Sequence, residues 1–334
     1  MTLVLSALSP AYVVQASDRR MTVDSLPKGD EFNKALVLQC DDGIFAVSFT
    51  GLGEVGGRRV DMWLAERLLD EGVPELAADD AMGAIALLAT EWFRTFPARI
   101  DKRHVFAIAG WQKRGAASRP SAWIVSNCLA EDGRAMLGAA SDAFEVRRQA
   151  IRESGTVEAY GLHQAISRPD RRRLKAALRS ARDVDRVEDA LVETIRSAAS
   201  KPAWSWGIGR NCMVISLSPA GEVRATYCPD STPKVEYGPF FLWYQGGRNY
   251  CAADIEALPP PGFGYRFGQA MLVGPSRPGA SPPALSQEDP SVARFRFRVS
   301  ESKHKHDPKR DVTLVETCRV EQRTVPSRYN STER

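Results

Sequence analysis

Short apolar runs open the chain, and their spacing predicts strands rather than helices. Turn residues separate these runs: Ser9-Pro10 follows the first run, and Asp41-Asp42-Gly43 lies between the third and the fourth. Four strands this close together favour an antiparallel meander. We expect these strands at residues 3–7, 12–16, 34–40 and 44–49.

The pattern then changes to helical spacing. Residues 60–69 repeat apolar side chains three and four positions apart, and residues 79–96 gather theirs on one face, with Asp79 or Asp80 as the expected N-cap. Further elements follow in this order: strands at 104–109 and 122–128, helices at 169–181 and 183–200, and strands at 212–217 and 223–228.

This order of elements predicts an α+β fold. Strands and helices come in alternating blocks, which a pair of antiparallel sheets accommodates when the helices lie outside both. We therefore expect a four-layer αββα sandwich with helices on both outer faces, followed by a C-terminal extension.

The last third of the chain differs in composition. Residues 229–274 are rich in Gly, Pro and aromatic residues and predict an ordered but irregular extension, whereas 275–290 have the composition of a flexible linker. Alternating residues at 293–299 and 312–320 predict a terminal β pair with 303–307 as its loop. The expected organisation is one domain over 1–228, the extension, the linker, and a basic C-terminal β pair and tail over 291–334.

Composition excludes several classes of protein. Of the 334 residues, 43% are hydrophobic and 26% are charged, which is typical of a globular chain and excludes a disordered protein, a collagen and a coiled coil. The formal charge of +4 is too small to indicate nucleic-acid binding, and the basic helix at 169–181 is interpreted as a solvated face. Neither a membrane span nor a signal peptide is recognisable, so we expect a cytoplasmic protein with no membrane or nucleic-acid partner.

Neither the cysteines nor the histidines form a metal-binding pattern. The six cysteines contain no CxxC pair, so reduced thiols are expected. The histidines lack acidic or cysteine partners at ligand spacing, and Gly207-Ile208-Gly209 lacks the third glycine of a dinucleotide fingerprint. We therefore expect no metal and no cofactor, and a turn at 207–209.

The second residue carries the most specific chemistry. Methionine is normally removed from a chain whose second residue is as small as threonine, and its removal would leave Thr2 with a free α-amino group beside its hydroxyl. An α-amine titrates at about 7.7–8.0, so near neutral pH it can act as the base that activates this hydroxyl. An N-terminal threonine thus supplies nucleophile and base together.

Thr2, Asp18 and Lys34 follow one another at intervals of 16 positions. Together with their flanking segments (TLV at 2–4, VVQASDRRMT at 13–22 and KALVL at 34–38), they resemble the catalytic β-subunits of proteasomes and the bacterial ring protease that begins Met-Thr. These proteins are N-terminal-nucleophile hydrolases. By order and pattern of elements, the resemblance extends over about residues 2–217.

The resemblance implies a role for each of these residues. Thr2 would be the nucleophile, Lys34 would lie within hydrogen-bond reach of its hydroxyl and favour the alkoxide, and Asp18 would keep Lys34 charged and oriented. A backbone N–H after the fourth strand would stabilise the oxyanion, with Gly51 as the candidate and Gly53 as the second choice. Substrate-lining positions of the family fall on Arg20 and Thr22.

Two departures from the family pattern concern the groups around the amine. The family has a Gly-Ser-Gly turn whose serine contacts the amine, but the corresponding residues 159–163 (AYGLH) contain no serine. The family also has an aspartate after the last long helix, where this chain offers only Ser200 or Ser205.

The sequence thus leads to two alternatives. The first is a threonine-type hydrolase that cleaves amide bonds, with a peptide as the favoured substrate, through an acyl-ester on Thr2. The resemblance also implies a homo-oligomer in the form of a ring. It does not identify any ATPase partner. The second is a catalytically inactive proteasome-like subunit that serves as an assembly or binding module.

Overall fold

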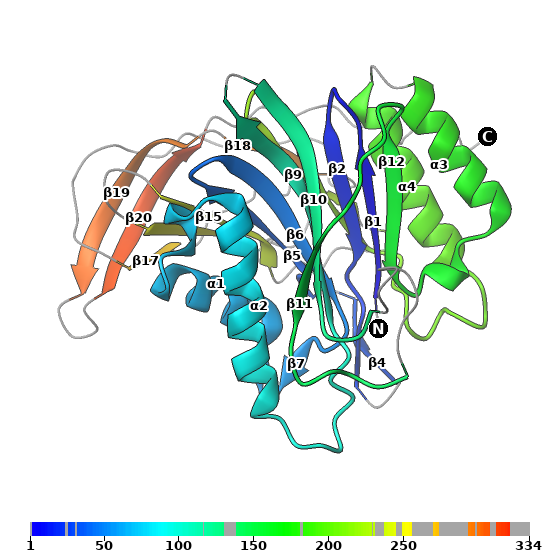
Figure 1. Ribbon diagram of the computed structural model, residues 1–334, viewed down its shortest axis with the longest axis horizontal. Helices are drawn as coiled ribbons and strands as arrows, with labels where there is room; N and C mark the ends of the chain where they lie inside the picture. Colours follow the sequence, from blue (N-terminus) through cyan, green and yellow to red (C-terminus); the bar gives the residue numbers. More distant parts are fainter. Residues whose placement is uncertain are drawn as a thin grey trace, which may run out of the picture.

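The computed structural model (Figure 1) describes most of the first 230 residues and the later strands. The described residues are 2–23, 26–30, 32–115, 117–129, 138–180, 183–228, 230, 237–244, 249–255, 270–273, 293–297, 299–307 and 312–320.

Two sheets form the centre of the molecule. The first has the strand order β12-β1-β2-β13-β14-β18. Its strands are β1 (Leu3–Leu8), β2 (Val13–Asp18), β12 (Thr156–Gly161), β13 (Cys212–Leu217), β14 (Val223–Cys228) and β18 (Ala293–Phe297).

The second sheet has the order β11-β10-β9-β6-β5-β15-β16-β17-β20-β19. Its strands are β5 (Ala35–Cys40), β6 (Gly43–Thr50), β9 (Val105–Arg114), β10 (Ala117–Ser126), β11 (Glu145–Arg148), β15 (Tyr237–Tyr244), β16 (Asn249–Ile255), β17 (Ala270–Val273), β19 (Val299–Asp307) and β20 (Val312–Val320). Two short ribbons add β3 (Met21–Val23) with β4 (Leu26–Gly29), and β7 (Glu54–Val55) with β8 (Arg58–Arg59).

The described residues form four α-helices, and two of them pack on each sheet. In Figure 1, α1 (Val60–Asp70) and α2 (Ala78–Arg94) lie over the second sheet, and α3 (Arg168–Ser180) and α4 (Val184–Ala199) lie beside the first. Two 3-10 turns are found at Val73–Glu75 and His163–Ala165. Among the described residues, no helix combines the length and the apolar character that a membrane span needs.

The alternation of side chains along each strand produces separate core layers. In β5, Leu36 and Leu38 pack with α1 and α2, whereas Ala35 and Val37 belong to a different apolar cluster. That cluster also contains Val13 of the first sheet, so it joins the two sheets face to face. Because successive strand residues point to opposite faces, one buried run serves both layers. The expected α+β fold is confirmed.

The first four long strands do not form a single meander, contrary to the expectation. β1 and β2 pair in the first sheet, whereas β5 and β6 pair in the second. The short ribbon β3–β4 connects the two hairpins. Local alternation predicts each hairpin, but the choice of sheet depends on packing between distant segments.

Smaller differences concern pairing and helix ends. Most ladders are antiparallel, but β15 pairs with β5 in parallel, so the second sheet is mixed. The N-cap of α2 is Ala77, without a side-chain cap, and Asp79 and Asp80 lie in the first turn of the helix. There their negative carboxylates interact favourably with the positive end of the helix dipole.

The C-terminal third contains more strand than its composition predicts. β15, β16 and β17 fall within 229–274, the segment expected to be irregular. Residues 303–307 belong to β19, which pairs antiparallel with β20, so they are not the expected loop. The predicted linker at 275–290 lies outside the described residues.

Candidate active site

The ends of five strands meet at one place between the two sheets. Thr2 directly precedes β1, Asp18 ends β2, and Lys34 directly precedes β5. Thr50 ends β6, and Gly161 ends β12. Because β1, β2 and β12 belong to the first sheet and β5 and β6 to the second, both sheets contribute to the site.

The three residues of the sequence motif lie in direct contact. The Lys34 ammonium donates to Thr2 Oγ1 at 2.6 Å and to Asp18 Oδ1 at 3.2 Å. It also donates to the backbone carbonyl of Arg20. All three donors of the ammonium therefore have acceptors, and one of these acceptors is the candidate nucleophile.

Asp18 is held by backbone donors as well as by Lys34. Its Oδ2 accepts from the backbone N–H of Leu3 at 2.8 Å. Its Oδ1 accepts from the backbone N–H of Arg20 at 2.9 Å and of Gly209 at 3.1 Å. Gly209 belongs to the predicted turn at 207–209, so this turn contributes a donor that fixes the carboxylate.

Burial dominates the electrostatics of the motif. Thr2 and Lys34 are each 3% exposed, and Asp18 is 0% exposed. Loss of hydration lowers the pKa of the Lys34 ammonium below that of a free lysine, while the neighbouring Asp18 carboxylate acts in the opposite direction. Lys34 is thus a cation whose proton is less tightly held than that of a surface lysine.

Arg20 and Thr22 flank the motif. The guanidinium of Arg20 forms a two-point ion pair with Asp30, at 2.5 and 2.6 Å, and also donates to the Ser205 carbonyl. Arg20 therefore contacts the motif through its backbone N–H and carbonyl, while its side chain binds Asp30, directly after β4. Thr22 lies half-buried in β3.

Gly51 has a backbone conformation and surroundings that only glycine fits. Its φ is +120°, and a Cβ there would lie 2.4 Å from the Arg103 carbonyl oxygen and 2.8 Å from His104 Nδ1. His104 is fully buried among aromatic rings, and burial lowers its pKa to about 3, so its imidazole is neutral. A Cβ on Gly53 would instead meet Met21 Sδ at 3.0 Å.

Two residues outside the predicted motif also contact Thr2. The Thr50 hydroxyl accepts from the Thr2 backbone nitrogen at 3.1 Å and donates to the Thr2 carbonyl oxygen at 3.1 Å. That carbonyl also accepts from the backbone N–H of Leu162 at 3.1 Å. No spacing rule links Thr50 to Thr2; the only sequence signal was its position directly before Gly51.

Gly161 allows β12 to approach Thr2. Its φ is +77°, and a Cβ there would lie 1.9 Å from the Thr2 carbonyl oxygen and 2.6 Å from Thr50 Oγ1. Residues 159–163, where the resemblance expects a serine-containing turn, thus lie against Thr2 through backbone atoms. Ser200 and Ser205 bond elsewhere: Ser200 Oγ contacts Arg210, and Ser205 Oγ donates to the Pro202 carbonyl.

Metal binding has no support in the part of the chain that the structure describes. Those residues contain no group of three or more His, Cys, Asp or Glu side chains arranged to hold a metal ion. Among them, four cysteines are buried free thiols.

Comparisons with known proteins gave structural resemblances only. No family model and no curated protein matches the chain. The structure is similar to Anbu (ancestral beta-subunit) from Yersinia bercovieri, at 12% identity over 65% of this chain and 81% of that one, with a TM-score of 0.46. It is also similar to the Anbu complex from Pseudomonas aeruginosa, described as a helical assembly, at 13% identity over 65% and 81%, with a TM-score of 0.44.

A third similar structure is Anbu from Hyphomicrobium sp. strain MC1, at 12% identity over 65% of this chain and 82% of that one, with a TM-score of 0.43. Anbu is a proteasome-like relative among N-terminal-nucleophile hydrolases.

Replacing Gly161 with alanine tests the close approach of β12 to Thr2. Gly221 is a matched control, because its φ is +81° and a Cβ there would meet nothing within 4 Å. Each alanine costs about 1–2 kcal/mol for a left-handed backbone. We expect Gly161→Ala to lower the free energy of unfolding, measured in urea, by clearly more than Gly221→Ala. Equal losses would show that Gly161 does not press on Thr2.

Proposed function

We propose that this protein is a threonine-type N-terminal-nucleophile hydrolase that becomes active when Met1 is removed. The observation that carries the proposal is the 2.6 Å hydrogen bond from the Lys34 ammonium to Thr2 Oγ1, with Asp18 on the same ammonium. A buried cation aimed at a hydroxyl has a chemical use, because it stabilises the oxygen as that oxygen loses its proton.

The first half of the reaction forms an acyl-enzyme. The free α-amine of Thr2 takes the proton from Oγ1, and Oγ1 attacks the carbonyl carbon of an amide. The carbonyl π electrons move to its oxygen, which becomes an oxyanion. The C–N bond then breaks as the Thr2 ammonium returns its proton to the departing amine, and an ester on Thr2 remains.

The second half uses water in place of the amine. The α-amine takes a proton from water, the resulting hydroxide attacks the ester, and Oγ1 recovers its proton as the acid leaves. The Lys34 charge assists both halves, since Oγ1 carries negative charge before attack and again on release. This scheme fits an amide substrate, and the sequence resemblance favours a peptide.

Thr50 would take the place of the absent serine. Its hydroxyl accepts from the Thr2 nitrogen and donates to the Thr2 carbonyl, so it fixes both sides of the residue that must serve as nucleophile and base. A processed amine held in this way would direct its lone pair instead of rotating freely. We propose Thr50 as a positioning residue for the amine.

Gly51 remains the proposed source of the oxyanion donor. It is joined directly to Thr50, whose side chain contacts Thr2, whereas Gly53 lies two positions further along and faces Met21. Arg20 and Thr22 are proposed to border the substrate, with Arg20 acting through the loop that it ties to Asp30. The catalytic domain is proposed to span 1–228, and a homo-oligomer, as the sequence resemblance implies, is part of the proposal.

Covalent labelling tests the function. We expect the intact mass of the purified protein to lack Met1, and a β-lactone or epoxyketone probe to label Thr2. Thr2→Ala should abolish labelling, and Lys34→Ala should slow it at least about a hundredfold, which corresponds to about 2.7 kcal/mol of lost transition-state stabilisation.

Lys28→Ala is the matched control for Lys34. Lys28 is exposed and pairs with Glu54 at 3.1 Å on the surface, so its loss should leave labelling unchanged. Retained Met1 would contradict the proposal, because no free amine would exist. A processed protein that resists the probe would favour the alternative, a binding or assembly module.

Two substitutions of Thr50 separate its hydroxyl from its volume. Thr50→Ser keeps the oxygen, whereas Thr50→Val keeps the shape and removes both hydrogen bonds to Thr2. We expect the valine variant to label about tenfold more slowly or worse and the serine variant to remain close to the original rate. Equal rates for the two variants would remove Thr50 from the mechanism.

The rate of labelling should depend on pH in a bell-shaped manner. On the acid side it rises as the Thr2 amine loses its proton, at about 7.7–8.0 for an unperturbed α-amine. On the alkaline side it falls as Lys34 loses its proton, and because burial lowers the pKa of Lys34, this fall should come below the pKa of a free lysine. A rate that stays level through the pKa of a free lysine would contradict a charged Lys34.

A further inference from the structure

A groove of about 680 Å³ follows the outer side of β12, away from the contacts of the Thr2 hydroxyl. Its lining includes all of β12 and the loop before it, together with one face of α3. Figure 1 shows β12 and α3 beside each other, with β1 on the other side of β12. The groove therefore runs along an edge of the first sheet.

The register of β12 identifies which backbone groups face this groove. Leu162 N–H donates to the Thr2 carbonyl. Every second residue counted back from Leu162, such as Glu158 opposite Ser6, therefore directs its backbone N–H and C=O groups to β1. Val157 and Ala159, in between, direct their N–H and C=O groups to the other side. His163 Nδ1 lies 3.1 Å from the Gly161 carbonyl, which agrees with this parity.

The outward groups of Val157 and Ala159 have no strand to pair with. β12 is the terminal strand in the order of the first sheet, so within the described ranges β1 is its sole neighbour. Both residues are half-buried and line the groove. An exposed strand edge of this kind can be extended by another strand.

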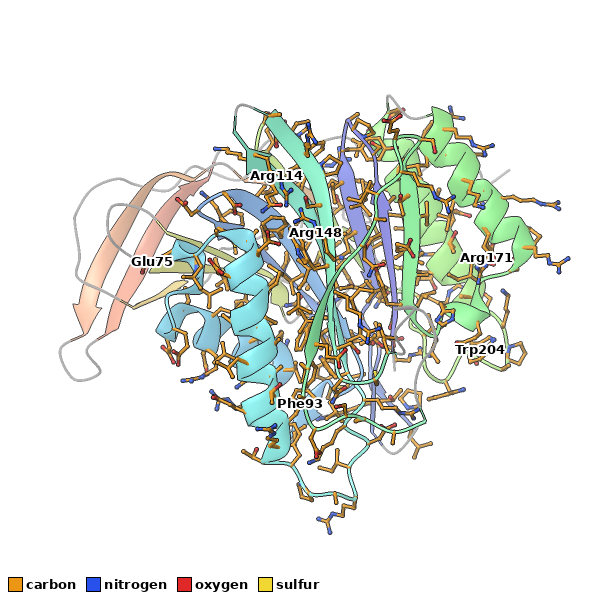
Figure 2. The ribbon with its side chains drawn as sticks, in the orientation of Figure 1. Glu75, Phe93, Arg114, Arg148, Arg171 and Trp204 are labelled. Atoms are coloured by element: carbon orange, nitrogen blue, oxygen red, sulfur yellow. The ribbon has the colours of Figure 1, made fainter. Side chains whose placement is uncertain are left out.

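The rim of the groove is strongly basic. Arg152 from the loop and Arg171, Lys175 and Arg179 from α3 line it, and all four are exposed. None of the four side chains has a hydrogen bond or an ion pair with the residues that the structure describes. Glu158 is a carboxylate of the lining, and it already takes part in an interaction of its own. Arg171, labelled in Figure 2, belongs to the first turn of α3.

Apolar side chains form the floor between this rim and the strand. Leu174 and Leu178 come from the same face of α3 as the cations, at helical spacing of four, and both are buried. The groove thus offers unpaired strand groups, an apolar floor and positive charge along one line.

We propose that this groove binds an extended acidic peptide segment of a partner protein, which adds a strand to β12. The backbone of the segment would pair with Val157 and Ala159, alternate apolar side chains would enter the floor, and its carboxylates would face the rim cations. A nucleic acid would match the charge but would leave the strand groups unpaired. Of the two rings in the lining, Tyr160 is 7% exposed and His163 is half-buried, so they give a base little surface to stack on.

Binding can be measured independently of the proposed hydrolase. The experiment uses the full chain carrying Thr2→Ala and a fluorescein-labelled peptide of alternating Glu and Val, with anisotropy as the readout. We expect saturable binding that weakens as salt is raised, and little binding of the alternating Lys and Val peptide. The same acidic peptide with N-methyl groups on alternate residues should bind at least about tenfold more weakly, because it loses its strand hydrogen bonds.

Protein variants locate the site. Arg171→Glu with Lys175→Glu should weaken binding at least about tenfold. Arg168→Glu with Arg172→Glu, an equal charge change on exposed α3 residues outside the lining, should leave it nearly unchanged. Ala159→Pro removes an outward N–H from an edge strand, where proline is tolerated, so it should weaken binding while the unfolding midpoint stays close to the original.

Several results would overturn the proposal. Equal binding of the N-methylated peptide would show a charged surface without strand pairing, and tighter binding of a single-stranded oligonucleotide would assign the groove to nucleic acid. Absence of peptide binding would also reject the proposal. If, in that case, sedimentation shows that the rim variants alter self-association, the groove would be assigned to a second copy of the chain. None of these outcomes depends on whether Thr2 reacts.

Discussion

A lysine ammonium buried between two sheets is the constraint on which the site depends. Removing such a charge from water costs several kcal/mol, so Lys34 is stable there only because acceptors surround it. Those acceptors are the Asp18 carboxylate, the Arg20 carbonyl and the Thr2 hydroxyl, all from the first sheet or its continuation, while Lys34 belongs to the second. Correct docking of the sheets and correct placement of the candidate nucleophile are therefore one event.

Close backbone approach completes the arrangement. Gly161 lets β12 reach the Thr2 carbonyl, and Gly51 lets the chain turn directly after Thr50, which holds Thr2 from both sides. The groups expected around the amine in the proteasome-like pattern, a serine and an aspartate, have no counterparts at those positions. In their place a threonine hydroxyl and a backbone N–H contact Thr2, so the surroundings of Thr2 use different atoms from those that the resemblance implies.

The strands and helices up to residue 228 could be predicted because each has a local signal. Apolar alternation locates β1, β2, β5 and β6, and helical spacing locates α1, α2 and α4. The assignment of β1–β2 and β5–β6 to different sheets has no local signal, since it depends on how the inter-sheet cluster around Val13 and Val37 packs. Within 229–274, β15 pairs with β5, a partner far away in sequence, so composition alone suggested irregular structure.

The residues of the candidate site also fall into those that the sequence could predict and those that it could not. Thr2, Asp18 and Lys34 could be named because their types and spacing match a known pattern, and the geometry brings them together. Thr50 and Gly161 could not, because neither carries a spacing rule and both act through contacts that exist only after the sheets have docked. The role of Arg20 was only partly visible: its backbone serves the motif, while its side chain is committed to Asp30.

The proposed roles are that Thr2 Oγ1 acts as the nucleophile and that Lys34 holds this oxygen. A crystal structure of the purified protein after reaction with a β-lactone tests this most directly. We expect continuous density from Thr2 Oγ1 to the acyl carbon, a free Thr2 amine in contact with Thr50, and Lys34 Nζ still within hydrogen-bond distance of that oxygen. Acylation of another side chain, or an unmodified Thr2 with Met1 still attached, would contradict it.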